Sequence, residues 1–97
     1  MKRRNKHYVY IVECRNGSYY TGYAKDINKR IEIHNRGLGA KYLRGKLPVR
    51  LVYSKEYPYY QDALKAENSL KKLTRKQKQD LIQIFNQSIV NDQIDKK

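Results

Sequence analysis

Two short segments near the start of the chain are mostly apolar or aromatic and are separated by a polar turn signal, and this pattern predicts a β-hairpin. Residues 7–15 (HYVYIVECR) and 18–24 (SYYTGYA) are rich in β-branched and aromatic side chains, which favour strands. Asn16-Gly17 lies between them and is a strong signal for a hairpin turn. We therefore expect the chain to begin with two antiparallel strands.

The loop length of this hairpin decides whether Tyr10 and Tyr20 share a face of the sheet. A two-residue turn, which local turn rules slightly prefer, would place the two phenols on opposite faces. A three-residue loop with Gly17 in the left-handed conformation would instead pair Tyr10 with Gly22 and make the phenols diagonal neighbours on one face. Local sequence rules leave both arrangements open.

After the hairpin, the spacing of apolar residues predicts a helix, a third strand and two more helices. Asp26 is a candidate N-cap for a helix that runs to about Asn35. Residues 49–57 (VRLVYSKEY) have strand character, and a helical period follows from Tyr59 to about Lys72. The order β-β-α-β-α-α predicts an α+β fold, with a small three-stranded, mostly antiparallel sheet flanked by helices.

Thr74 is a candidate cap for the last helix, whose buried side is expected to include Leu81, Ile82, Phe85 and Ile89. The chain of 97 residues has no linker-like stretch, so we expect one domain over residues 1–85. Residues 86–97 are expected to be the end of that helix and a polar tail that frays.

The charge balance indicates a polyanionic partner. The chain has 22 Lys and Arg against 9 Asp and Glu, a formal net charge of +13, which favours nucleic acid over a merely solvated basic surface. Anionic lipid is disfavoured because the predicted helices lack a strongly apolar face. The cations expected to contact nucleic acid lie around the glycine-containing loop 36–48 and at the end of the second helix: Arg36, Lys41, Arg44, Lys46, Arg50, Lys71 and Lys72.

The chain shows no sign of export or membrane insertion. Its apolar runs are too short for a transmembrane span, and its basic N-terminus is not followed by the apolar stretch of a signal peptide. The single cysteine, Cys14, cannot form an internal disulfide and is expected to pack in the core. A reducing cytoplasm is the expected location.

Two predicted helices carry polar residues where a buried stripe is expected. Ile27, Ile31 and His34 follow the spacing of a buried face, and Arg30 lies one turn before His34 on the same side. His34 could be a hydrogen-bonded boundary histidine with Arg30 extending to solvent, or both could belong to a site.

In the second predicted helix, Glu67 is likewise a polar residue on the side that is expected to be buried. Leu64, Glu67 and Leu70 are spaced by three, which directs the Glu67 carboxylate toward the protein body. Such a carboxylate is costly unless it is paired or binds a metal. Its partner is therefore Arg30 or a nearby lysine, or it is a ligand for a hard cation such as Mg²⁺.

These features together resemble the GIY-YIG nuclease superfamily. The resemblance rests on Tyr8-Val9-Tyr10 and Tyr20-Thr21-Gly22 and continues in register to about residue 82, with segments shared at positions 26–35, 37–42, 48–53 and 63–73. The first motif reads YVY in place of GIY, and the second reads YTG. Tyr23 stands where the excision-repair members carry a lysine. The length resembles that of small stand-alone bacterial members.

The resemblance implies cleavage of DNA phosphodiesters with one divalent metal, Mg²⁺ or Mn²⁺. Carried over by position, the implied catalytic residues are Tyr10, Tyr20, Arg30, His34 and Glu67, with Glu67 as the metal ligand. This mechanism needs both phenols on one face, so we expect the three-residue hairpin loop, with Gly22 leaving room beside Tyr10.

Two functions compete. One is an endonuclease acting on DNA, with RNA as a further candidate substrate and with a homodimer or a larger protein partner as candidate assemblies. The other is a basic nucleic-acid-binding module with little or no catalysis, in which Glu67 is only an ion-pair partner.

Overall fold

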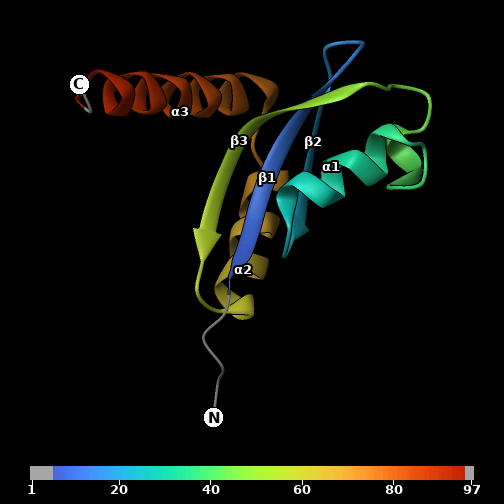
Figure 1. The fold of residues 1–97 in the computed structure, drawn as a ribbon, viewed down its shortest axis with the longest axis horizontal. Coiled ribbons are helices and arrows are strands. Elements are labelled where there is room, and N and C mark those ends of the chain that lie inside the picture. Colours follow the sequence, from blue (N-terminus) through green and yellow to red (C-terminus); the bar gives the residue numbers. More distant parts are fainter. Residues whose placement is uncertain (1–5, 96–97) are drawn as a thin grey trace.

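A three-stranded sheet in the order β2-β1-β3 forms the centre of the structure (Figure 1). The computed structural model describes residues 6–95, and side chains from residue 6 to residue 89. The strands are β1 (His7–Cys14), β2 (Tyr19–Ala24) and β3 (Val49–Tyr57). Both pairings are antiparallel, which confirms the predicted sheet.

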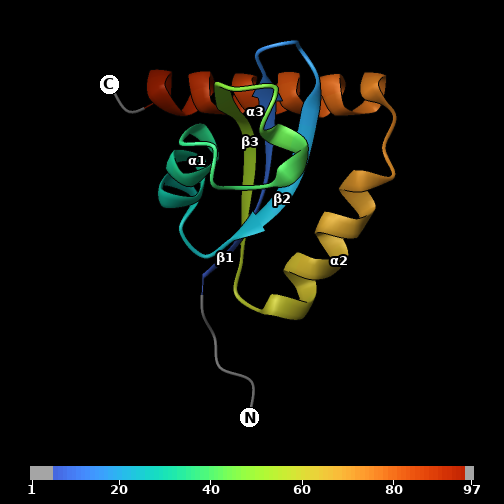
Figure 2. The same cartoon turned by 90° about the vertical axis from the view of Figure 1, so that its right-hand side faces the viewer.

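Three helices flank the sheet and confirm the predicted order. They are α1 (Ile27–Asn35), α2 (Tyr60–Lys71) and α3 (Arg75–Asp95), and a short 3-10 turn, η1 (Lys41–Leu43), lies within the predicted loop. Figure 2 shows α1 and α2 on opposite sides of the sheet and α3 across one end. Helix α3 continues to Asp95 and crosses residue 85 without a break. The domain limit expected at residue 85 stays a prediction.

The hairpin has the three-residue loop. The Cys14 N–H donates to the Ser18 carbonyl at 2.8 Å, the Gly17 N–H donates to the Cys14 carbonyl at 2.9 Å, and Gly17 has a φ of +86°. In this register Tyr10 pairs with Gly22. Tyr10 and Tyr20 therefore share a face, as the three-residue arrangement predicts.

The two-residue turn preferred by local rules is not the one adopted, and Asn16 supplies a physical reason. Its Oδ1 accepts hydrogen bonds from the Ser18 N–H at 3.1 Å and the Ser18 hydroxyl at 2.7 Å. These bonds stabilise a turn that begins at Asn16 and continues to Ser18. The side chain thereby competes with the shorter turn that Asn-Gly usually makes.

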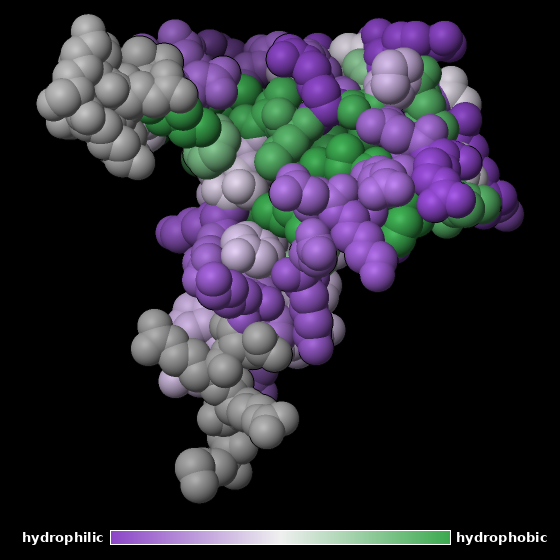
Figure 3. Space-filling view, viewed as in Figure 1, coloured by the Kyte–Doolittle hydropathy of each residue, from purple (hydrophilic) through white to green (hydrophobic). Residues whose placement is uncertain are grey.

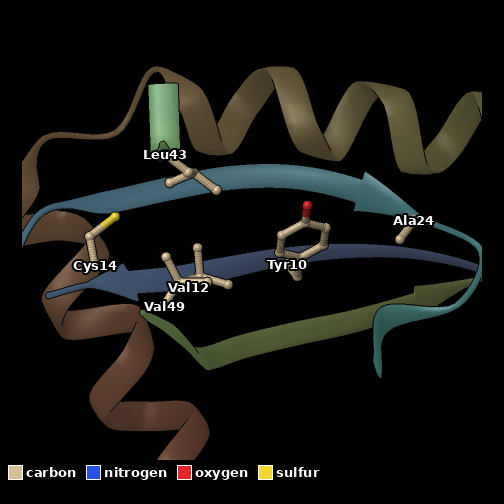
Figure 4. Close-up of a cluster of buried hydrophobic side chains, with 6 residues drawn as sticks. All are labelled: Tyr10, Val12, Cys14, Ala24, Leu43 and Val49. Carbon is tan, nitrogen blue, oxygen red and sulfur yellow. The ribbon is translucent and has the colours of Figure 1, made fainter. Parts of the chain in front are cut away.

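Strand alternation divides the core between the two faces of the sheet. On the α1 face, the buried side chains are Tyr10, Val12, Cys14, Ala24, Leu43 and Val49 (Figure 4). On the other face, Ile11 and Val52 pack against Ile82 of α3. Phe85 lies edge-on to Tyr53, whereas Ile89 is 41% exposed.

The predicted buried side of α3 therefore includes Ile82 and, in part, Leu81 and Phe85, but not Ile89. The burial prediction for Ile89 is wrong because the sheet ends before the helix does, as Figure 1 shows where α3 projects past the strands. In Figure 3, hydrophobic side chains gather in the upper part of the face, where α3 meets the sheet, and hydrophilic side chains cover most of the remainder. Within residues 6–95, no helix has both the length and the apolar character to cross a membrane.

The loop between α1 and β3 is closed at its base by one amide. Asn35 Nδ2 donates to the Val49 carbonyl at 3.1 Å, and the Val49 N–H donates to Asn35 Oδ1 at 2.7 Å. Both backbone groups of the first β3 residue are therefore satisfied by the last residue of α1. This clamp fixes the two ends of the segment 36–48 next to the sheet.

Candidate active site

Tyr10 and His34 form a buried polar pair at the centre of the candidate site. Strand β1 directs Tyr10 toward the α1 face, and the last turn of α1 directs His34 toward the sheet. The Tyr10 hydroxyl lies 2.9 Å from His34 Nε2, and each residue is only 1% exposed. Because buried polar groups need hydrogen-bond partners, this bond explains how His34 can occupy the core stripe of α1.

The other ring nitrogen of His34 is held by the loop that follows α1. The Ala40 N–H donates to His34 Nδ1 at 3.2 Å. This approach depends on Gly39, because a Cβ atom there would overlap His34 Nδ1 and lie 2.8 Å from Cε1.

Gly22 likewise permits a close approach, in this case by the Tyr10 ring. A Cβ atom at Gly22 would lie 2.5 Å from the Tyr10 hydroxyl oxygen and 2.6 Å from Cζ. The room that the sequence led us to expect beside Tyr10 is therefore filled by the Tyr10 ring itself.

Arg30 lies one turn before His34 on α1 and shifts the pKa of both Tyr10 and His34. Burial raises the pKa of Tyr10 to about 12, although the nearby Arg30 guanidinium opposes the rise. Burial and the Arg30 charge both lower the pKa of His34. At neutral pH the pair is therefore a neutral phenol and a neutral imidazole next to a cation.

Tyr20 is packed between His34 and the 36–48 loop. Its ring meets that of His34 edge-on at a centroid distance of 5.7 Å and stacks on Tyr42 at 5.9 Å. The Lys46 ammonium lies 3.9 Å from the centroid of the Tyr42 ring. These contacts bring Tyr20 next to His34, and they place the Lys46 ammonium on the Tyr42 ring that stacks on Tyr20.

Glu67 of α2 contributes the carboxylate of the site. Its side chain is 15% exposed and pairs with Lys71 Nζ at 3.1 Å, and its charge raises the pKa of Tyr10. Of the alternatives that the sequence left open, the structure shows the nearby lysine as its ion-pair partner. The expectation that Leu64 shares the inward stripe is wrong: Ala63 is buried and Leu64 is 40% exposed, because α2 is turned slightly on the sheet.

The donor set fits one magnesium-type cation. Among the described residues, no group of three His, Cys, Asp or Glu side chains could hold a metal. Glu67 alone suits Mg²⁺, which commonly takes one or two protein carboxylates and completes its shell with water and substrate phosphate. Lys71 would have to move aside for a cation to reach the Glu67 carboxylate.

The cations predicted to contact nucleic acid lie mostly in exposed positions, and several have acidic or aromatic partners. Arg50 Nη2 lies 2.6 Å from Glu13, and Arg36 lies 4.0 Å from Glu32. The remaining exposed members of the set are Lys41, Arg44, Lys71 and Lys72, of which Lys71 pairs with Glu67. Exposed pairs of this kind are weak and can exchange their carboxylate for a phosphate.

Tyr23 lies on the opposite face of the hairpin and makes a second aromatic cluster. Its hydroxyl lies 2.6 Å from His7 Nδ1, and its ring packs edge-on against Tyr60 of α2. The residue that replaces the repair-nuclease lysine is thus directed away from Tyr10, because alternate residues of β2 face opposite sides.

Three contributors to this site, all in the 36–48 loop, cannot be identified from side-chain patterns. They are the backbone N–H of Ala40, the missing side chain of Gly39 and the ring of Tyr42. The two glycines directly after the helix, Gly37 and Gly39, are the available signal, although glycines at this position usually mark only the end of a helix.

Comparison with known proteins relates most of the chain to one protein family. The sequence profile of the GIY-YIG catalytic domain matches residues 6–80. A UPF0213 protein from Staphylococcus aureus (strain Mu3) is 54% identical over 78 residues, which cover 80% of this chain and 95% of the relative.

Two structures solved by NMR in solution have a similar fold. The UPF0213 protein BH0048 from Bacillus halodurans is 46% identical, with a TM-score of 0.54 over 81% of this chain and 84% of its own. The protein EF2693 from E. faecalis is 39% identical, with a TM-score of 0.58 over 89% of this chain and 92% of its own.

Proposed function

The chain belongs to the GIY-YIG family, and from this premise we propose that it is a divalent-metal-dependent endonuclease that hydrolyses DNA phosphodiester bonds. The observation that carries the proposal is the hydrogen-bonded pair of Tyr10 and His34, whose pKa values both respond to Arg30, within the electrostatic reach of Glu67. The four side chains come from β1, α1 and α2. The fold therefore brings them together, and no local sequence motif contains them all.

Each side chain has a use at a phosphodiester. The Arg30 guanidinium would bind the non-bridging oxygens of the scissile phosphate. Tyr20, which is less buried than Tyr10, would lie nearest to an attacking water and accept its proton. Glu67 would hold Mg²⁺ or Mn²⁺, which when bound neutralises charge that develops on the phosphate and the leaving oxygen.

A basic binding module with little catalysis is the second candidate function. The ion pair between Glu67 and Lys71 favours it, because a carboxylate already matched with an ammonium needs no metal. The exposed cations of the 36–48 loop would then clamp the nucleic-acid backbone, and affinity would fall steeply with salt.

A cleavage assay with matched variants separates the two functions. Purified protein is incubated with branched, nicked and plain duplex DNA in Mg²⁺ or Mn²⁺, and then with chelator. Glu67→Gln is compared with Asp80→Asn, because Asp80 forms a similar i,i+4 pair with Lys76 at 3.0 Å on α3. We expect cleavage by the wild type and by Asp80→Asn, and none by Glu67→Gln or with chelator.

Cleavage that persists in Glu67→Gln would identify a contaminant and exclude the nuclease assignment. Salt-sensitive binding by every form, without cleavage by any, would favour the binding module.

A further inference from the structure

We propose that the loop segment Gly39-Ala40 fixes His34 as its Nε2–H tautomer, so that this imidazole donates a hydrogen bond to Tyr10. The proton of the Tyr10 phenol then points away from His34. This assignment makes His34 a positioning residue for the Tyr10 phenol and not a base. The roles rest on the proposed nuclease function, whereas the tautomer does not.

The tautomer follows from the partner of Nδ1. A backbone N–H can only donate, so the 3.2 Å bond from Ala40 requires a lone pair on His34 Nδ1. A neutral imidazole without a proton on Nδ1 carries it on Nε2. The short contact with Tyr10, 2.9 Å from Nε2, is therefore a bond from His34 to the phenol oxygen.

The surroundings also oppose a charged ring. An imidazolium would place an Nδ1–H against the Ala40 N–H, and burial and the Arg30 charge lower the pKa of His34 further. The groups facing the ring are Tyr10 from β1, Tyr20 from β2 and Arg30 from its own helix. None of them is a carboxylate that would stabilise a proton on Nδ1.

The Tyr10 oxygen then accepts the hydrogen bond that His34 Nε2 makes to it. Because the phenol oxygen is the acceptor of that bond, its own O–H points away from His34. Burial raises the pKa of this phenol most, Arg30 lowers it, and the charge of Glu67 raises it.

Gly39 makes this arrangement sterically feasible, and Gly45 offers a matched control. A Cβ atom at Gly39 would overlap His34 Nδ1, whereas one at Gly45 would meet no atom within 4 Å. Both glycines lie in the 36–48 loop, so alanine at each position tests the same segment with and without the contact to His34.

Long-range ¹H–¹⁵N NMR of the protein without substrate tests the tautomer directly. We expect His34 at pH 7.5 to show an unprotonated Nδ1 and a protonated Nε2, with the signals assigned by their loss in His34→Gln. Gly45→Ala should keep this pattern, and Gly39→Ala should lose it. A protonated Nδ1 in the wild type, alone or as imidazolium, would overturn the proposal even if Gly39→Ala does not fold.

Cleavage by two His34 variants tests the role. The Gln side chain in His34→Gln can still donate toward Tyr10 but cannot act as a base, whereas His34→Leu can do neither. We expect His34→Gln to stay within about 10-fold of the wild type and His34→Leu to lose about 100-fold or more. Equal loss in both variants would overturn the donor role, whereas a wild type that cuts no DNA would refute the nuclease function and leave the NMR result standing.

Discussion

Each face of the hairpin has one histidine–tyrosine pair, and the two pairs differ in their neighbours more than in their own geometry. Tyr10 meets His34 at 2.9 Å on the α1 face, and Tyr23 meets His7 at 2.6 Å on the other. All four residues are buried or half-buried. The hydrogen bond between the two ring types is therefore common to both pairs and cannot by itself define a site.

The difference lies in charge and in backbone contacts. Tyr10 and His34 are both influenced by Arg30, and Tyr10 also by Glu67. The pKa of Tyr23 is raised by burial and by the neighbouring Tyr60, so among the described groups no cation or carboxylate accounts for its shift. The comparison teaches that a cation, a carboxylate and a backbone donor convert a structural pair into one suited to chemistry.

Removing one hydroxyl from each pair should give the largest difference. Tyr10→Phe should lower the cleavage rate by about 100-fold, because the candidate site loses the phenol hydroxyl that is bonded to His34. Tyr23→Phe should change the rate by less than about 2-fold and cost about 1 kcal/mol of stability through the lost bond to His7. Initial rates and urea unfolding of both variants measure the effects, and equal rate losses would erase the distinction.

The close packing of Tyr10 against Gly22 should make Gly22→Ala destabilising. A Cβ atom 2.6 Å from Tyr10 Cζ must displace a ring that is fully enclosed, and we expect the free energy of unfolding to fall by about 3 kcal/mol.

A double-mutant cycle gives the control. In a Tyr10→Leu background the clashing ring atoms are absent, so the added cost of Gly22→Ala should be much smaller. Full additivity of the two losses, measured by urea unfolding, would show that Tyr10 does not approach Gly22 so closely.

The site histidine should also make stability depend on pH. Because the folded protein lowers the pKa of His34, the unfolded chain binds the proton more readily. The stabilisation is therefore complete above the ordinary histidine pKa of about 6.5 and is lost as the pH falls through the folded value. Urea unfolding between pH 5 and 8 should show a smaller acid loss in His34→Gln than in the wild type, and an unchanged slope would contradict the assignment.

The smallest effect is expected at Thr21, which lies on the Tyr23 face of β2. Its buried hydroxyl has no hydrogen-bond partner among the described residues, so Thr21→Val removes an unsatisfied polar group while keeping the shape. We expect the free energy of unfolding to stay within about 0.5 kcal/mol or to rise by about 1 kcal/mol. A loss above about 1 kcal/mol, measured by urea unfolding, would indicate a partner such as a bound water.

Periodicity was sufficient to predict the fold, because each element presents its apolar residues at one spacing. The β-branched and aromatic run around Tyr10 indicated a strand, and the stripe ending in His34 indicated a helix. Register was harder, because the bonds between Asn16 and Ser18 that support the longer loop compete on nearly equal terms with a two-residue turn. Family resemblance, rather than turn rules, selected the correct register.

The candidate site was predictable where side-chain type carries the information and not where backbone geometry does. Arg30 and Glu67 stood out as charges at inward positions. The N–H of Ala40 did not, because every residue except proline has one, and only the three-dimensional path of the loop directs it at His34. The rotation of α2 that exposes Leu64 likewise depends on how the helix packs on the sheet, which sequence spacing does not specify.

The amide clamp between Asn35 and Val49 also bears on self-association. Strand β3 is an edge of the sheet, and an edge strand offers unpaired backbone groups to any other extended chain. At Val49 both outward groups are already bonded to Asn35, so a second strand could not begin to pair there without displacing it. The contact that anchors the 36–48 loop thus also protects one end of the sheet from edge-to-edge aggregation.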